Sequence, residues 1–594
     1  MFKKNAKPRV IGIILEEIGT DFSKELIQGV VDAVPDDRSV RLIVLAGKYL
    51  NPEIDSANML AYKAVYNSIF RLDEICDIDG LIIHLGSMST RKKKVIKTGY
   101  SEKFQRIPKV FIASDIEGET VINYDNESGI REAVESLVNV NNLTNLCMLG
   151  GRDDNIDARA RKQIFIRCLQ ENGVSFFDRN YESTDMSENC VDEALRLLER
   201  NPEVQAVFCV NDSVARGLYE AMGQKGLVPG RDILVFGFDN TRMAGEMKPP
   251  LTSIGADSCT LGQKALEVLL AKLDGKKSYS AFVPTRLYGR ESMNYDMYDY
   301  TTMEMLNVNP SFIYRMFDDC FYRHHNSRLR REDVDLRRLY FEFIFRMLQS
   351  MKHRYMGPEE FHSLGKMIDV FFEKGAMEYT DAIKLVKCIE KLQAAVNSQQ
   401  RSPAANIRIN RLFQRMKDRA IYSLSVQKTV EHDLHYENVR MMHDFMVMSS
   451  TYGVHGDQRP DIVCRNIDKL GLTHAILYLF EKPVKYDLTS RLIFPEKIKL
   501  KCILRDNELY LLPKERQQCL IKEMFTRNEF SLKCKGYAAF PVFYEDVLYG
   551  VVMCGLVNNI CDRGEYIAIQ LGRAIYLERL RDSDRNNDNY PIPT

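Results

Sequence analysis

The stretch VFCVNDSVARGLYEAMGQKGLVPGRDILVFGFDNTRMAGEMKPPLTSI, residues 207–254, decides the fold of the front half of this chain. It opens on an apolar strand pattern, continues through an amphipathic helical pattern at 213–224 and returns to an apolar run at 233–236. A strand, a helix and a second strand in succession predict a unit with parallel strands. Ligands of such sheets bind beyond the carboxyl ends of the strands, which is where Asn211 and Asp239 stand.

The same alternation of short apolar runs and amphipathic stretches extends over residues 8–292. It predicts an α/β fold, with a parallel sheet covered by helices on both faces. We expect strands at 10–15, 41–45, 80–84, 110–112, 121–123, 146–149, 206–210 and 233–236, and helices at 21–34, 128–138, 158–172 and 213–224.

Four short motifs lie in order along this region. They are Gly150-Gly151 followed by the helix start DARAR at 157–161, the turn NDSVA at 211–215, the strand end VFGFDN at 235–240, and PPLTSI at 249–254. Together they resemble the ligand-binding core of LacI/GalR-type repressors, which shares the periplasmic-binding-protein type I fold. The resemblance implies a two-lobed sensor over residues 1–292.

The resemblance also implies a ligand site in the cleft between the lobes. At the position of Arg161 the family donates hydrogen bonds to hydroxyl or ring oxygens, which suits the rigid fork of a guanidinium. Asp239 would accept from sugar hydroxyls or an amine, and Asn211 can both donate and accept. Phe22 could stack on an apolar ligand face, and Asp21 is a further candidate.

Each of these residues also has a purely structural interpretation. The pair at 211–212 is placed to cap the helix that follows it, and Asp239 is a candidate turn residue. Arg161 could pair with Asp157 on its own helix face, and Phe22 could belong to the core. These alternatives stay open at the level of the sequence.

One departure from the family pattern concerns the strand at 110–112. Many relatives place an aspartate directly after it, whereas this chain has Ala113, with Asp115 two residues later. A sugar or a nucleoside is the ligand that the resemblance favours. A different ligand, or a pocket that has lost its ligand, is compatible with the incomplete pattern.

Residues 293–450 change character, since strand-like runs vanish and apolar residues recur at helical spacing. We expect a helical linker or signalling region. The stretch 406–448 lacks both proline and glycine, which favours one long helix or a helical pair. Its apolar stripe could be a dimer seam or a face packed on a neighbour.

Residues 451–580 return to mixed structure, with an amphipathic helix expected at 461–470 and a final helix at 565–579. The runs AAFPV at 538–542 and LYGVV at 548–552 predict a hairpin around the turn at 543–546. This region resembles GAF-type domains, which implies an α+β fold.

The order of the regions resembles the input half of GGDEF receptors, but no GGDEF sequence occurs. We expect residues 581–594 to be a disordered tail.

Composition limits the function classes. Lys+Arg and Asp+Glu both number 82, so no basic excess indicates nucleic-acid binding. The 14 cysteines show no zinc spacing, and we predict no metal and no cofactor. Many free thiols and the lack of a long apolar segment indicate a cytoplasmic protein without membrane contact. No catalytic or nucleotide-binding motif is present, so we do not expect an enzyme.

We therefore predict a cytoplasmic small-molecule sensor that acts in transcription regulation or signal transduction, as a homodimer with a partner or an output domain in trans. The sensor begins near residue 8, so we expect no helix-turn-helix headpiece before it. A dimerising scaffold that binds no ligand is one alternative. A DNA-binding regulator with an unrecognised DNA-binding element is another.

Overall fold

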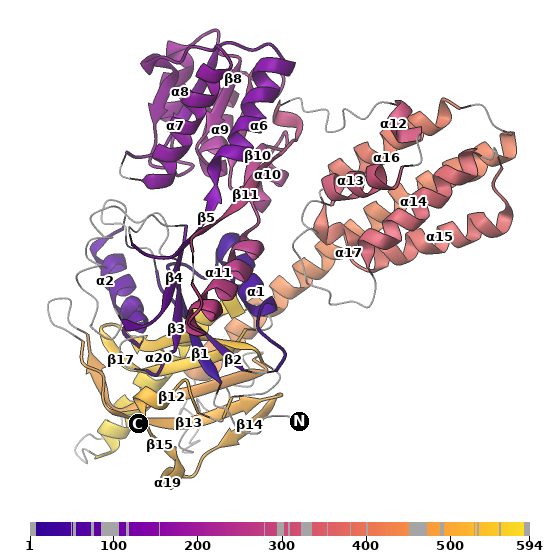
Figure 1. The fold of residues 1–594 in the computed structure, drawn as a ribbon. Coiled ribbons are helices and arrows are strands. Elements are labelled where there is room, and N and C mark those ends of the chain that lie inside the picture. Colours follow the sequence, from indigo (N-terminus) through magenta and orange to yellow (C-terminus); the bar gives the residue numbers. More distant parts are fainter. Residues whose placement is uncertain are drawn as a thin grey trace, which may run out of the picture.

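Figure 1 shows the computed structural model of the chain, which has two stacked lobes, a helical region to one side and an α+β unit at the base. The structure describes residues 8–586 except for 38, 49, 51–54, 73–75, 85–105, 114–117, 154, 278, 294–301, 307–308, 322–334, 353–354, 381, 400–401, 451–471, 487–491, 528, 531–533 and 557–559.

The first lobe is built on a parallel sheet with the strand order β2-β1-β3-β4-β5. Its strands are almost wholly apolar because helices cover both faces. Helices α1 and α11 pack against each other beside this sheet. The elements are β1 (Arg9–Leu15), α1 (Asp21–Asp32), β2 (Val40–Ala46), α2 (Ala57–Tyr66), β3 (Gly80–His84), β4 (Lys109–Ile112), β5 (Val121–Asp125) and α11 (Ser258–Leu273).

The second lobe has its own parallel sheet, in the order β7-β6-β8-β9-β10, and a separate hydrophobic core. Helices lie on both faces of this sheet (Figure 1). The elements are α6 (Asn126–Glu135), β6 (Leu146–Gly150), α7 (Ile156–Glu171), β7 (Tyr181–Ser183), α8 (Val191–Arg200), β8 (Ala206–Cys209), α9 (Asp212–Gln224), β9 (Leu234–Phe238), α10 (Arg242–Glu246) and β10 (Thr252–Ala256).

Strand β11 (Ala281–Tyr288) belongs to both lobes. Its first residues pair in parallel with β5 of the first lobe, and its last residues pair antiparallel with β10 of the second. The chain also passes between the lobes after β5 and after β10. Three connections therefore join the lobes, which is an arrangement suited to hinge motion about a cleft.

The α/β prediction is confirmed for this part of the chain, and each of the eight expected strands occurs within two residues of its expected bounds. Strands β7, β10 and β11 were not predicted. Each of them mixes polar and apolar residues or is only a few residues long, so the sequence lacks the continuous apolar run that marks a buried parallel strand.

The middle of the chain is helical, as predicted, and has a third hydrophobic core. The choice between one long helix and a helical pair is settled, because α17 is one continuous helix of 48 residues. The helices are α12 (Thr302–Leu306), α13 (Pro310–Cys320), α14 (Leu336–Lys352), α15 (Pro358–Glu373), α16 (Ala382–Asn397) and α17 (Pro403–Ser450).

The C-terminal unit, also called the base, is an antiparallel sheet packed against one long helix, α20. The expected hairpin occurs as β16 and β17. The GAF-type resemblance stays a prediction, and the helix expected at 461–470 lies outside the described residues. The elements are β12 (His474–Lys485), β13 (Lys497–Arg505), β14 (Glu508–Leu511), β15 (Gln518–Leu520), β16 (Gly536–Tyr544), β17 (Val547–Gly555) and α20 (Ile560–Asn586).

The prediction of a disordered tail from residue 581 is wrong for residues 581–586, because α20 continues to Asn586. Residues 581–586 read RDSDRN, which looked like a tail because it carries no apolar residue. They continue a helix whose earlier turns pack on the sheet. Packing of those turns, rather than local propensity, extends this helix.

The base and the first lobe share one sheet and one core, whereas the sequence suggested separate modules. Strand β16 pairs in parallel with β2, with Gly536 opposite Leu42 and Ala539 opposite Leu45. The guanidinium of Arg41 donates to the carbonyls of Phe525 and Arg527, at 2.7 and 2.9 Å. Strand β16 thereby covers an edge that β2 would otherwise expose.

Candidate functional site

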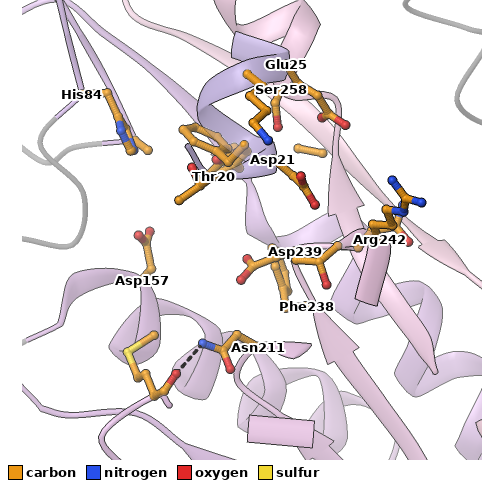
Figure 2. A pocket seen from close by; sticks show the side chains of 18 of the residues that line it. Thr20, Asp21, Glu25, His84, Asp157, Asn211, Phe238, Asp239, Arg242 and Ser258 are labelled. Carbon is orange, nitrogen blue, oxygen red and sulfur yellow. Dashed lines mark hydrogen bonds between the residues drawn. The ribbon is translucent and has the colours of Figure 1, made fainter. Parts of the chain in front are cut away.

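A cavity of about 650 Å³ lies between the two lobes. Side chains from the carboxyl ends of β3, β5 and β9 line it, together with residues of the first turns of α1 and α7. Parallel α/β sheets bind ligands at this edge. In Figure 2 the carboxylates of Asp21, Asp157 and Asp239 point into the same space.

All five residues that the sequence singled out line this cavity. They come from both lobes: Asp21 and Phe22 from α1 of the first, and Arg161, Asn211 and Asp239 from the second. The structure therefore brings the predicted set together around one space. Their role in binding a ligand stays a prediction.

Arg161 is held by partners inside the second lobe. Only 4% of the residue is exposed. Nη1 donates to the carbonyl of Val210 at 2.7 Å, and Nη2 donates to Oδ1 of Asp239 at 3.2 Å. The guanidinium also lies over the ring of Phe238, 3.5 Å from its centroid. Arg161 thus fixes the position of Asp239 at the cavity wall.

Asp239 combines the two interpretations that the sequence left open. Its φ of 98° lies in the left-handed region that non-glycine residues rarely adopt, so it does form the turn after β9. About 45% of its side chain is nevertheless exposed along the cavity, and one oxygen is paired with Arg161. Strained backbone of this kind is concentrated at ligand-binding and catalytic sites.

Asn211 also has both roles at once. Its Oδ1 accepts from the backbone N–H of Val214 at 2.8 Å, which confirms the capping interpretation for this residue. Its Nδ2 donates to the carbonyl of Met186 at 3.0 Å, the contact drawn dashed in Figure 2. The amide therefore positions Met186 at the cavity and caps α9.

Asp212, the neighbour considered as a cap, instead braces the second lobe from inside. It is 1% exposed and accepts from the backbone N–H and the hydroxyl of Thr241 and from the hydroxyl of Ser253. The pKa of this carboxyl is raised to about 7, mainly by burial and to a smaller extent by the charge of Asp239. The hydrogen bonds from Ser253 and Thr241 oppose the shift.

This raised pKa predicts a pH dependence of stability. A carboxyl whose pKa is higher in the folded than in the unfolded chain stabilises the fold in acid, and the contribution is lost as the pH rises through about 7. The melting temperature of the wild type relative to Asp212→Asn should fall by several degrees between about pH 5 and pH 8. The exposed Asp178→Asn serves as control, and its melting temperature should differ from that of the wild type by the same amount at each pH. A difference between Asp212→Asn and the wild type that also stays constant with pH would contradict the raised pKa.

An aromatic group forms the wall on the side of the first lobe. The ring of Phe22 lies 4.6 Å from that of His84 and 6.3 Å from that of Tyr124, between centroids. Burial lowers the pKa of His84 to about 4, so its ring is neutral at pH 7. Phe22 also packs against the first core, so both interpretations of this residue describe part of its surroundings.

The sequence missed several lining residues. His84 and Tyr124 stand at the ends of β3 and β5, and the strand-end rule that selected Asp239 could have found them. Ala113 lines the cavity, while Asp115 lies outside the described residues. Glu378 reaches the cavity from the helical region, and no local sequence signal predicts that.

The base also reaches the cavity lip. Lys24, which lines the cavity, forms an ion pair of 2.7 Å with Asp562 in the first turn of α20. Close by, the ammonium group of Lys48 bridges Glu17 of the first lobe and Glu565 of α20, each at 2.6 Å. Both lobes and the helical region therefore line the cavity, and the base contacts one of its lining residues.

Comparisons with known proteins agree with this architecture. Residues 134–293 match the family model of the periplasmic binding protein-like domain. The matched residues cover most of the second lobe together with α11 and β11. Over 277 residues the chain is 25% identical to the HTH-type transcriptional repressor PurR of Vibrio vulnificus (strain CMCP6), covering 45% of this chain and 76% of that protein.

Two further similarities fall on the same part of the chain. Catabolite control protein A of Priestia megaterium is 24% identical over 289 residues, covering 48% of this chain and 82% of its own length. The solved structure of CcpA of Lactococcus lactis has 19% identity and a TM-score of 0.40, covering 48% of this chain and 100% of that one. PurR is a transcriptional repressor, and CcpA of Lactococcus lactis is a transcription regulator.

Two kinds of feature are absent from the described residues. In that part of the chain no group of three or more His, Cys, Asp or Glu side chains is arranged to hold a metal ion. Nor does any helix there combine the length and the apolar character needed to cross a bilayer.

Proposed function

We propose that this chain is a small-molecule sensor whose ligand binds in the cavity between the two lobes. The observation that carries the proposal is the cavity itself, which is lined by charged and polar side chains and, on one side, by aromatic rings. A dimerising scaffold that had lost its ligand would be expected to fill this space with side chains. The relatives, which are ligand-sensing transcription regulators, support the same proposal.

The charges around the cavity favour an uncharged ligand with many hydroxyl groups, such as a sugar or a nucleoside. Arg161 is already engaged by Asp239, and Lys24 by Asp562. An anionic ligand would meet more carboxylates than cations. The carboxylates are Asp21, Glu25, Asp157, Asp239 and Glu378, and the cations are Lys24, Arg161 and Arg242.

The output of the sensor would be regulation of transcription or a signalling step in the cytoplasm, through a partner. Closure of the lobes on a ligand would move the second lobe relative to the first. Glu378 would pass that movement to the helical region, and Lys24 would pass it to α20, since both residues lie at the cavity. Binding of DNA is not part of this proposal.

A thermal-shift screen of the full chain against neutral sugars, nucleosides and sugar phosphates tests the proposal. A cognate ligand at 100 times its dissociation constant should stabilise the fold by about 2.7 kcal/mol. We expect a hit among the neutral compounds and none among the phosphates. A flat response, with a LacI-family protein and its own ligand responding in parallel, would favour the scaffold instead.

A further inference from the structure

Helix α17 has a second apolar face in addition to the one that it buries. Leu412 and Met416 pack into the core of the helical region, and Phe445 packs into the core of the first lobe and the base. Other large apolar side chains on the same helix are exposed to solvent. They are Ile407 (55% exposed), Ile421 (63%), Tyr422 (61%), Val426 (42%), Val430 (50%), Tyr436 (66%), Val439 (50%), Met446 (38%) and Val447 (44%).

Helical geometry places six of these exposed residues together in two adjoining rows, whereas Val430 lies 18 residues, or about five turns, after Leu412 and therefore on the side of the packed residues. Ile421 and Val439 are separated by 18 residues, which is about five turns of 3.6 residues, and Met446 follows about two turns later. Tyr422, Tyr436 and Val447 form an adjoining row by the same rule.

The buried side chains lie across the helix from these rows. Leu412 lies 27 residues before Val439, about seven and a half turns, and therefore on the opposite side. The two rows, hereafter the outer face, thus point away from the packed face of α17.

The middle of α17 has little support within the chain. In Figure 1 the helix leaves the helical region and runs toward the base. Between residues 421 and 440, none of the side chains that the structure describes is buried. Most of the stability of a helix in a protein comes from packing of its apolar face, and contiguous exposed apolar surface marks an interaction site. Both considerations call for a covering partner.

The charges along α17 indicate which partner covers it. The first half, residues 403–428, is basic, and the second half, residues 429–450, is acidic. Asp369, Glu390 and Glu246 form ion pairs with basic residues of the first half, and when these three carboxylates are counted the first half still has an excess of two positive charges. The second half has an excess of three negative charges. The charged residues are Arg408, Arg411, Arg415, Lys417, Asp418, Arg419 and Lys428, then Glu431, Asp433, Glu437, Arg440 and Asp444.

We propose that the outer face of α17 is covered by α17 of a second copy of this chain, with the two helices antiparallel. An antiparallel pair places each basic half against an acidic half, and the same apolar rows are supplied by both copies. Such an interface is self-complementary and closes as a two-fold dimer. A parallel pair would instead place like charges together along its whole length.

Sedimentation velocity on the full chain over a range of concentrations tests this proposal. We expect a dimer for the wild type and a monomer for the double variant Ile421→Glu/Val439→Glu. Both positions are exposed, so the thermal melt of the double variant should stay cooperative. The matched control is Ile493→Glu, in which an isoleucine 79% exposed on the C-terminal unit is changed. This variant should remain a dimer.

Ionic strength tests the orientation, because opposite charges attract less when screened. In the antiparallel arrangement the dissociation constant of the dimer should rise severalfold between about 0.05 and 0.5 M salt. A wild-type chain that stays monomeric, or a dimer that survives Ile421→Glu/Val439→Glu, would overturn the proposed surface. A dimer that these substitutions break, yet that tightens with salt, would overturn the antiparallel orientation.

Discussion

Gly29→Ala in α1 is expected to lower the free energy of unfolding by about 2–3 kcal/mol. Helices α1 and α11 cross with backbones almost in contact, and a β-carbon on Gly29 would lie 2.0 Å from the carbonyl oxygen of Cys259. Gly262 of α11 makes the reciprocal approach, 2.3 Å from the carbonyl of Leu26. Backbone atoms cannot rotate aside as a side chain can, so the helices must separate.

This separation would also move Asp21 and Phe22, which stand at the start of α1 and line the cavity. Urea denaturation of the full chain measures the loss of stability, and Gly223→Ala is the matched control. Gly223 lies in α9 with open space around its α-carbon, so alanine there should stabilise by about 0.5–1 kcal/mol through helix propensity. Equal stability of Gly29→Ala and wild type would show that the helices lie farther apart.

The lobes could be predicted from the sequence because their signals are local. A buried parallel strand such as β1 is a continuous apolar run, and the turn after β9 carries its motif within six residues. Asp239 and Arg161 were therefore found together, although they are 78 residues apart in the chain. Both lie at ends of elements that local patterns define.

Contacts between distant segments could not be predicted from local sequence patterns. The pairing of β2 with β16 joins residues almost 500 apart, and either strand alone reads as an ordinary buried strand. Glu378 and Asp562 reach the cavity or its lip only because whole regions dock there. A single charged residue on a helix carries no sign of the surface that it will meet, so this part of the site required the structure.

Asp239→Ala is expected to abolish the ligand-induced rise in melting temperature and to lower the free energy of unfolding of the unliganded protein by about 3 kcal/mol, because it leaves the buried guanidinium of Arg161 without its carboxylate. The side chain of Asp239 is itself 45% exposed at the cavity, so little packing is lost with it. Arg161→Ala should abolish the same response and lower the free energy of unfolding by a similar amount, about 3 kcal/mol. Arg161 is buried, and its loss leaves Asp239 and the carbonyl of Val210 without their donor.

Loss of the ligand response in these two variants therefore has to be distinguished from loss of stability. The matched control is Arg167→Ala on the same helix, whose side chain is 51% exposed and pairs with Glu127 at the surface. Such a pair contributes under about 1 kcal/mol, so both stability and ligand response should be nearly unchanged. A ligand response retained in Asp239→Ala would place the binding site elsewhere in the chain. A response lost in Arg167→Ala would mean that the loss reports a disturbed helix rather than a lost ligand contact.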